Sequence, residues 1–174
     1  MKKCTVYVRN AGLDPASYYR IYQYAEKIDC EFTFRSMFTD KEFRKNQSIR
    51  SKFLKKLYQA WLVLKVRKRA VGYLNEDLKA ADSVQLDCIF VQRDIVPRLH
   101  SRKVCEKLGK LAEKVRILWD FDDDIIGNGE IPAQEMKLLT EKCDRIIVTH
   151  EHLKDKLPEE ARSKVCLLPT TDLQ

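Results

Sequence analysis

The chain has 174 residues, of which 44% are hydrophobic, and its formal net charge is +7. This length and apolar content predict one domain with a well-buried core and exclude a disordered chain. No apolar run approaches the roughly 18 residues of a membrane-spanning helix, and the N-terminus lacks the apolar centre of a signal peptide. We therefore expect a cytoplasmic protein.

Six short apolar runs alternate with longer helical patterns along the chain. Each run is almost continuously apolar, which is typical of strands buried on both faces of a parallel sheet. Asp14 and Pro15 mark the clearest helix start, as cap and first-turn residue. The alternation predicts an α/β fold with a Rossmann-like, doubly wound, mostly parallel sheet of about six strands and helices on both faces. The predicted strands are 5–9, 31–35, 87–92, 115–120, 145–149 and 165–168, and the predicted helices lie near 15–28, 48–80, 98–114, 132–143 and 150–157.

The chain contains six cysteines, and no two of them form a CxxC pair. Cys4, Cys88 and Cys166 fall within apolar, strand-like runs. We therefore expect buried, reduced thiols rather than a disulfide framework or a zinc site.

The positive charge is concentrated in residues 41–80, which hold twelve Lys and Arg against three acids and therefore carry +9. Tyr58, Trp61, Leu62 and Leu64 are interleaved with these basic residues, which favours an acidic partner such as anionic lipid or a phosphorylated substrate. The alternative is an ordinary solvated helix face. The sharper prediction is that 41–79 contacts an anionic membrane surface peripherally, at the inner face of the membrane. Nucleic acid is not expected, because no motif for it is present.

Four carboxylates follow an apolar run in the stretch RILWDFDDDIIGNG, residues 116–129. The glycine-containing segment after the run predicts the loop that leaves a strand. Ligands bind at the carboxyl ends of the strands in open parallel sheets, so Asp120, Asp122, Asp123 and Asp124 occupy a candidate site. Because like charges lie so close together, at least one of these carboxyls is expected to have a raised pKa, which suits a general base.

Three other interpretations of the acids stay open. A phosphatase-like superfamily places a nucleophilic Asp in a D-x-D motif after an apolar strand, but that motif normally opens the chain and ends in Thr or Val, where Asp124 stands here. The acids can instead bind a metal in a non-catalytic module. In the third interpretation, Asp120 and Asp122 accept hydrogen bonds from loop and helix-start amides.

Several segments occur in an order that is typical of one family. SYYRIYQYAEKI, DCIFVQRDIVP, ILWDFDDDII, CDRIIVTHEHLKDKL and VCLLPTTDL together resemble the N-terminal half of glycosyltransferases with the two-Rossmann-domain (GT-B) architecture. Two phrases depart from that pattern, because the first loop holds one glycine and the last phrase has Pro-Thr-Thr-Asp in place of Asn-Gly. The resemblance implies that 1–174 is a single acceptor-side domain, and that the C-terminal donor-binding domain is absent from this chain.

The resemblance implies transfer of a sugar from a nucleotide-sugar donor to a hydroxyl of a sugar or lipid-linked acceptor, with a cleft-facing carboxylate as general base and no required metal or other cofactor. Asp122 and Asp123 are the candidate bases. Asp120, as the last predicted strand residue, is expected to serve structure. The competing prediction is a non-catalytic Rossmann-like binding or regulatory module.

Binding roles are expected for four other residues. Tyr19 and Arg20 form the Tyr-Arg pair of the first helix, and Arg93 ends the middle strand, where a guanidinium suits an anionic acceptor or the donor phosphate. Salt bridges to the acid cluster are the alternative for both arginines. His150 is expected at the edge of the cleft, at a helix start that Thr149 would cap.

Overall fold

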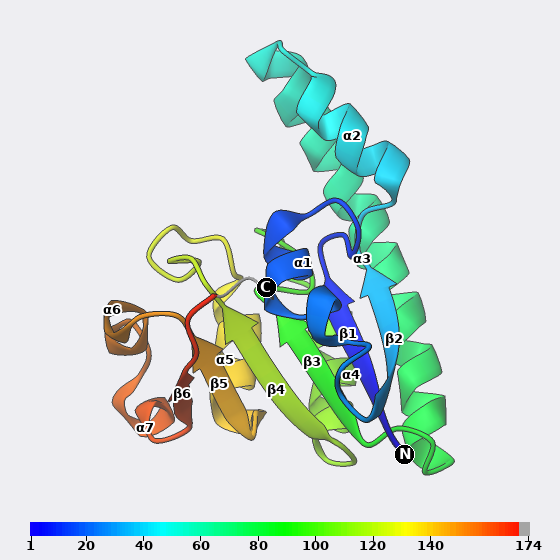
Figure 1. The fold of residues 1–174 in the computed structure, drawn as a ribbon. Helices are drawn as coiled ribbons and strands as arrows, with labels where there is room; N and C mark the ends of the chain where they lie inside the picture. The colour runs from blue at the N-terminus through cyan, green and yellow to red at the C-terminus, as the bar shows by residue number, and fades with distance from the viewer. Residues whose placement is uncertain (171–174) are drawn as a thin grey trace.

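The computed structural model describes residues 1–170. These residues form one six-stranded sheet with helices on both faces, and all neighbouring strands are parallel (Figure 1). The strand order is β2-β1-β3-β4-β5-β6. The predicted α/β class and parallel sheet are confirmed, and each predicted strand is present. The strands are β1 (Lys2–Val8), β2 (Cys30–Ser36), β3 (Cys88–Gln92), β4 (Arg116–Phe121), β5 (Arg145–Val148) and β6 (Val165–Leu167).

The five predicted helices are present in the predicted order, but their ends differ, and α2 (Asp40–Ser48) and α7 (Glu159–Arg162) were not predicted. The first helix ends at Arg20 rather than at residue 28, because Ile21 leaves the helical conformation and packs its side chain against the sheet. The pattern over 48–80 belongs to a helix that starts at Lys52 and ends at Asp82, and the charged segment before it forms a helix of its own. The helices are α1 (Pro15–Arg20), the short 3-10 helix η1 (Tyr22–Tyr24), α2 (Asp40–Ser48), α3 (Lys52–Asp82), α4 (Arg102–Ala112), α5 (Ala133–Lys142), α6 (Glu151–Asp155) and α7 (Glu159–Arg162).

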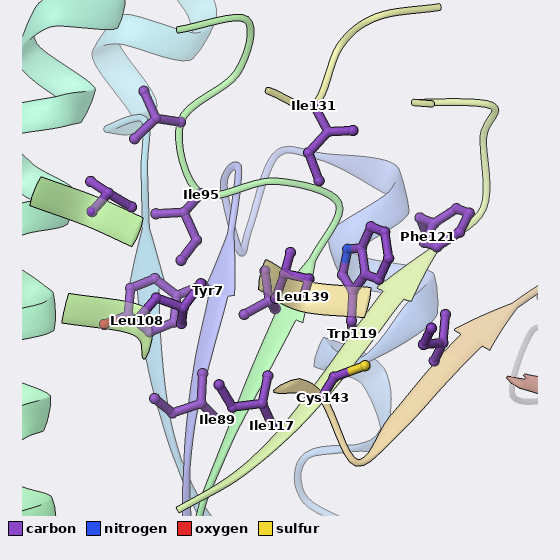
Figure 2. Packing of buried hydrophobic residues seen from close by; sticks show 14 of the residues in the cluster. Tyr7, Ile89, Ile95, Leu108, Ile117, Trp119, Phe121, Ile131, Leu139 and Cys143 are labelled. Atoms are coloured by element: carbon purple, nitrogen blue, oxygen red, sulfur yellow. The ribbon is translucent and has the colours of Figure 1, made fainter. Parts of the chain in front are cut away.

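The two faces of the sheet are covered unequally. Residues of α3 to α7 pack against one face around Trp119, Phe121 and Ile117, which are fully buried. The rings of Trp119 and Phe121 lie 4.7 Å apart, and Figure 2 shows them among the other large side chains of this core. Within residues 1–170, α1 is the main helix on the other face (Figure 1). The smaller second core on that face contains Val6, Val8 and Ile21.

Helices α2 and α3 form a hairpin that extends beyond the sheet (Figure 1). The hairpin begins with a capping box, in which Thr39 and Glu42 each accept a hydrogen bond from the other residue's backbone amide. Glu42 also binds Arg69 of α3 through both carboxylate oxygens, at 3.0 and 3.1 Å. These contacts hold a strongly charged short helix in place, although it buries few apolar side chains.

All six cysteines are free thiols. Cys4 is buried as predicted, but Cys166 is exposed. The expectation for Cys166 was wrong because β6 is a three-residue edge strand. Within residues 1–170, no helix combines the length and the apolar character that a membrane span requires.

Candidate functional site

The candidate site lies where the chain reverses direction across the sheet. The chain passes from β1 to β2 on one side and then returns to β3 on the other side, so the carboxyl ends of β1 and β3 flank a topological switch point. Arg9 directly follows β1, and Arg93 and Asp94 directly follow β3. Asp122 and Asp123 follow the neighbouring strand β4. Residues that are far apart in sequence thus meet at one edge.

Arg20 and Asp120 form a buried ion pair beneath this edge. Both side chains are almost fully buried, and the Arg20 Nε donates to both carboxylate oxygens at 3.1 and 3.2 Å. Arg20 also donates through Nη1 to the carbonyl oxygen of Leu168 at 2.7 Å. Burial raises the pKa of Asp120 to about 6, although Arg20 opposes the shift. The expected structural role of Asp120 fits this geometry. Arg20 forms a salt bridge to the acid cluster, which was the alternative to its expected role in binding an anionic ligand.

Arg93 is the centre of the exposed half of the site. Its backbone is left-handed, with φ 66°, and the indole N–H of Trp119 donates to its carbonyl oxygen at 2.8 Å. The guanidinium donates to Asp123 through Nη1 and to Glu130 through Nη2, the latter at 2.9 Å. Nη1 also lies 3.6 Å from Asp122 Oδ1. The backbone conformation therefore turns one buried arginine toward three carboxylates.

The three acids after β4 have different surroundings. Asp123 is bound by Arg93, and 64% of its side chain is exposed. Asp122 is 22% exposed, and its buried Oδ1 accepts no hydrogen bond from residues 1–170. Asp124 instead accepts the amide of Gly127 at 2.6 Å, which closes the turn after the strand. The amide-accepting role that was considered for Asp120 and Asp122 therefore belongs to Asp124.

Glu130 joins three arginines from two loops, those after β1 and β3. It accepts hydrogen bonds from Arg9 and Arg93, each at 2.9 Å, and its other oxygen lies 3.7 Å from Arg98. Burial alone would raise the pKa of Glu130, but the hydrogen bonds from Arg9 and Arg93 outweigh it and lower the pKa below its usual value. An ionised Glu130 thus balances part of the positive charge at the edge.

Two further carboxyls are buried behind this network. Burial raises the pKa of Asp94 to about 6, and one of its oxygens accepts no hydrogen bond from the described residues. Glu135 of α5 is fully buried and accepts the amide of Ile95 at 2.6 Å. Burial, with a smaller contribution from Asp94, raises the pKa of Glu135 to about 8. Glu135 is therefore mostly protonated at neutral pH.

A cavity of about 270 Å³ opens between this network and the α2–α3 hairpin. The two helices contribute both apolar and amide side chains to its lining, and the loops after β1, β3 and β4 contribute charged groups. This mixture of apolar side chains with a few polar groups is typical of small-ligand pockets. The cavity is lined by Arg9, Phe38, Phe43, Asn46, Gln59, Leu62, Val63, Pro97, Arg98 and Glu130.

Tyr19 and His150 lie nearer to solvent than the arginines. Tyr19 is 40% exposed and packs edge-on against Tyr18. His150 is exposed at the end of β5, where its ring stacks on His152. Thr149 does not cap the following helix as expected, because its hydroxyl donates to the carbonyl oxygen of Asp122 at 3.3 Å. That bond ties the loop after β5 to the loop of the acids.

Sequence reasoning missed several residues of the site. Arg9 is the last residue of a predicted strand and Asp94 follows another, so the same strand-end rule that selected Asp122 would have found them. Glu130 and Glu135 carry no such signal, since one belongs to a loop and the other to a helix.

Arginines separate the carboxylates of this edge from one another. Among residues 1–170, no three His, Cys, Asp or Glu side chains come together in an arrangement that could hold a metal ion. The chemistry that the edge offers is therefore carboxylate and guanidinium chemistry. No protein-family model, curated protein or solved structure matches this chain, and the resemblance to glycosyltransferases rests on its sequence motifs alone.

Proposed function

We propose that this chain is the acceptor-side domain of a glycosyltransferase, which moves a sugar from a nucleotide-sugar donor to an acceptor hydroxyl. The position of Asp122 carries the proposal, since its carboxylate lies at the carboxyl edge of the sheet beside Arg93. Arg93 in turn binds Glu130, which lines the cavity. A carboxylate there can take the proton of an acceptor hydroxyl. The hydroxyl oxygen then bonds to the sugar carbon, and the nucleoside diphosphate leaves with the electron pair of the broken bond.

Asp122 suits the base better than Asp123 does. The carboxylate of Asp123 already accepts a hydrogen bond from Arg93, whereas the carboxylate of Asp122 is 22% exposed and lies 3.6 Å from Arg93 without a hydrogen bond between them. Asp123 then acts by holding the guanidinium of Arg93 beside the reacting groups. In this proposal Asp122 takes the proton and Asp123 positions Arg93.

The cavity is the proposed site for part of the acceptor. Its volume of about 270 Å³ is small for a ligand pocket and fits a compact group. Arg98 lines it with a guanidinium that is 69% exposed and whose one ion pair within the described residues is a 3.7 Å contact with Glu130, so it is accessible to an anionic group of the acceptor. Tyr19 and His150 are proposed to contact acceptor or donor from the exposed side of the edge, and the donor itself is held mainly by a second domain.

The test is turnover by the protein with its donor domain. Asp122→Asn should lower kcat by roughly 10² to 10⁴, the range for loss of a general base, while the KM for the acceptor changes little. Asp123→Asn should lower kcat less, because Arg93 keeps Glu130 as a partner. Asp155→Asn, at an exposed position of α6, is the matched control and should leave turnover unchanged. Near-normal turnover in Asp122→Asn, in Asp123→Asn and in the double variant would overturn the catalytic assignment.

A second test uses residues 1–174 alone. UDP or GDP at sub-millimolar concentration should not raise the Tm, since a ligand stabilises only when its concentration is well above its Kd for the folded state. Acceptor sugars that fit the cavity should raise it, and Arg98→Gln should remove that shift. A clear thermal shift by the nucleotides, or sugar transfer by these residues alone, would contradict the acceptor-side assignment.

The second candidate is a non-catalytic binding or regulatory module. It is favoured by one observation, which is that Arg9, Arg20 and Arg93 already form ion pairs with acids of the same edge. A module would show the acceptor-dependent thermal shift without any turnover that depends on Asp122. The two functions therefore predict the same binding and different kinetics.

A further inference from the structure

The first half of α3 carries an apolar stripe on its exposed side. The stripe consists of Phe53, Leu54, Leu57, Trp61 and Leu64, whose exposed fractions are 70, 57, 55, 47 and 60%. Four of these residues follow a spacing of three, four and three residues, which places them on one face of a helix. No residue from 51 to 61 is buried, so this face has no protein covering among the described residues.

Basic residues surround the stripe. Residues 40–69 hold eleven Lys and Arg against two acids, a net charge of +9. Within residues 1–170, only Lys65 and Arg69 of these eleven cations form ion pairs, and both pair with Glu42. The ammonium of Lys65 also lies 4.3 Å from the centre of the Trp61 ring. The hairpin therefore presents apolar side chains within a field of largely unpaired positive charge.

The position of the hairpin makes the stripe accessible to a flat surface. Helix α3 has 31 residues and is therefore about 46 Å long. Its buried side chains begin at Leu62. Figure 1 shows α2 and the beginning of α3 extending past the carboxyl ends of β1 and β2. The tip can thus meet a surface that the rest of the domain does not touch.

We propose that this stripe docks on an anionic lipid bilayer, with its apolar side chains at the headgroup level and its lysines and arginines against the lipid phosphates. Amphipathic helices with basic and aromatic residues bind membranes in this way. A second copy of the chain is a poor occupant, because two hairpins of charge +9 repel each other. Nucleic acid would match the charge but would leave the apolar stripe in water. The proposal is independent of sugar transfer.

The two tryptophans of the chain make the test specific. Trp61 belongs to the stripe, whereas Trp119 is fully buried in the core, so a change in emission on lipid binding reports Trp61. Vesicles of phosphatidylcholine with about one third phosphatidylglycerol should shift the emission to the blue and co-sediment with the protein. Pure phosphatidylcholine vesicles should do neither. About 0.5 M salt should remove most of the binding.

Paired variants separate charge from apolar contact. Lys52→Glu with Lys56→Glu should weaken binding to the anionic vesicles at least about tenfold, whereas Lys103→Glu with Lys110→Glu, which makes the same charge change on exposed positions of α4, should have little effect. Leu57→Ser should weaken binding, and Ile28→Ser, at another exposed apolar position, should not. Circular dichroism confirms that each variant is folded.

Four outcomes would overturn the proposal. The first is equal binding to neutral and anionic vesicles, and the second is no binding to either. The third is co-sedimentation without a shift in Trp61 emission. The fourth is a dimer in light scattering that Leu57→Ser converts to a monomer, which would identify the stripe as a contact between copies.

Discussion

Arg20, the last residue of α1, holds the carboxylate of Asp120, which lies one hundred residues further along the chain. The pair connects the helix on the sparsely covered face to β4 in the middle of the sheet. The same guanidinium binds the carbonyl oxygen of Leu168, so it also fixes the segment after β6. Asp120 is therefore distinct from the acids that follow it, although all four are close in sequence.

This pair predicts a large effect on stability when one partner is removed. Arg20→Met should lower the free energy of unfolding by about 3 to 5 kcal/mol, because it leaves a buried carboxylate without its counter-charge. Urea unfolding monitored by circular dichroism measures the change. The double variant Arg20→Met with Asp120→Leu should recover much of the loss, since the buried charge is then gone.

An exposed ion pair serves as the control for this experiment. Arg102 and Glu106 are four residues apart on α4, and their side chains are 85 and 53% exposed. Arg102→Met should change stability by less than about 1 kcal/mol. If Arg20→Met is as mild as Arg102→Met, the buried pair does not connect the helix to the sheet.

Glu135 predicts a specific dependence of stability on pH. Its pKa is raised from 4.5 to about 8 in the folded protein, so the folded state keeps a proton that the unfolded chain has lost in this range. The stability linked to this group is complete below the unfolded pKa and is lost as the pH rises through the folded one. Glu135→Gln keeps an oxygen for the amide of Ile95 and removes the titration. By pH 8 the variant should be more stable than the wild type by a few kcal/mol, at about 1.4 kcal/mol per pKa unit.

The free energy of unfolding is measured from pH 5 to pH 9 for Glu135→Gln and for the wild type, and the difference between the two proteins is followed against pH. The difference cancels titrating groups that do not interact with Glu135. Asp94, whose raised pKa acts in the same direction, raises the pKa of Glu135 and therefore contributes to the difference. Glu141→Gln, at an exposed acid of the same helix, should follow the wild type. Parallel curves for Glu135→Gln and the wild type would show that Glu135 does not hold a proton in the folded state.

The strands were predictable because burial on both faces leaves a continuous apolar run, as in β3 and β4. Helix α2 was missed because it is strongly charged and gains its stability from Thr39, Glu42 and Arg69. The capping box at 39–42 was the one local signal for it. The predicted helix lengths were wrong where tertiary contacts determine the end of the helix, as at Ile21.

The candidate site was predictable only where its residues follow strands. Asp122, Asp123 and Arg93 were found by that rule, and the structure brings them together at one edge. Glu130 approaches Arg9 and Arg93 through a loop whose course no local pattern specifies. Which acid binds which arginine also depends on the left-handed backbone at Arg93, a residue type that rarely adopts it.

The capping box predicts local rather than global destabilisation of the hairpin. Thr39→Ala should cost about 1 kcal/mol, and hydrogen exchange should accelerate in α2 but not in β3. The pKa of Glu42 is lowered to about 2, where hydrogen bonds from Arg69 and Thr39 outweigh burial, so its contribution is present above 4.5 and lost as the pH falls toward 2. Equal hydrogen-exchange protection of α2 in the wild type and in Thr39→Ala would show that the cap is dispensable.

Two glycines provide a matched pair in which the same substitution has opposite effects. Gly72 is an exposed position within α3, and Gly129 has a left-handed φ of 61° in the loop after β4. A Cβ at either position meets no atom within 4 Å, so steric contact cancels from the comparison. Gly72→Ala should raise the free energy of unfolding by about 0.5 to 1 kcal/mol, because alanine favours the helix. Gly129→Ala should lower it by about 1 kcal/mol, because an L-residue resists the left-handed conformation. Urea unfolding with unchanged m-values measures both, and effects of the same sign would contradict the backbone assignment at Gly129.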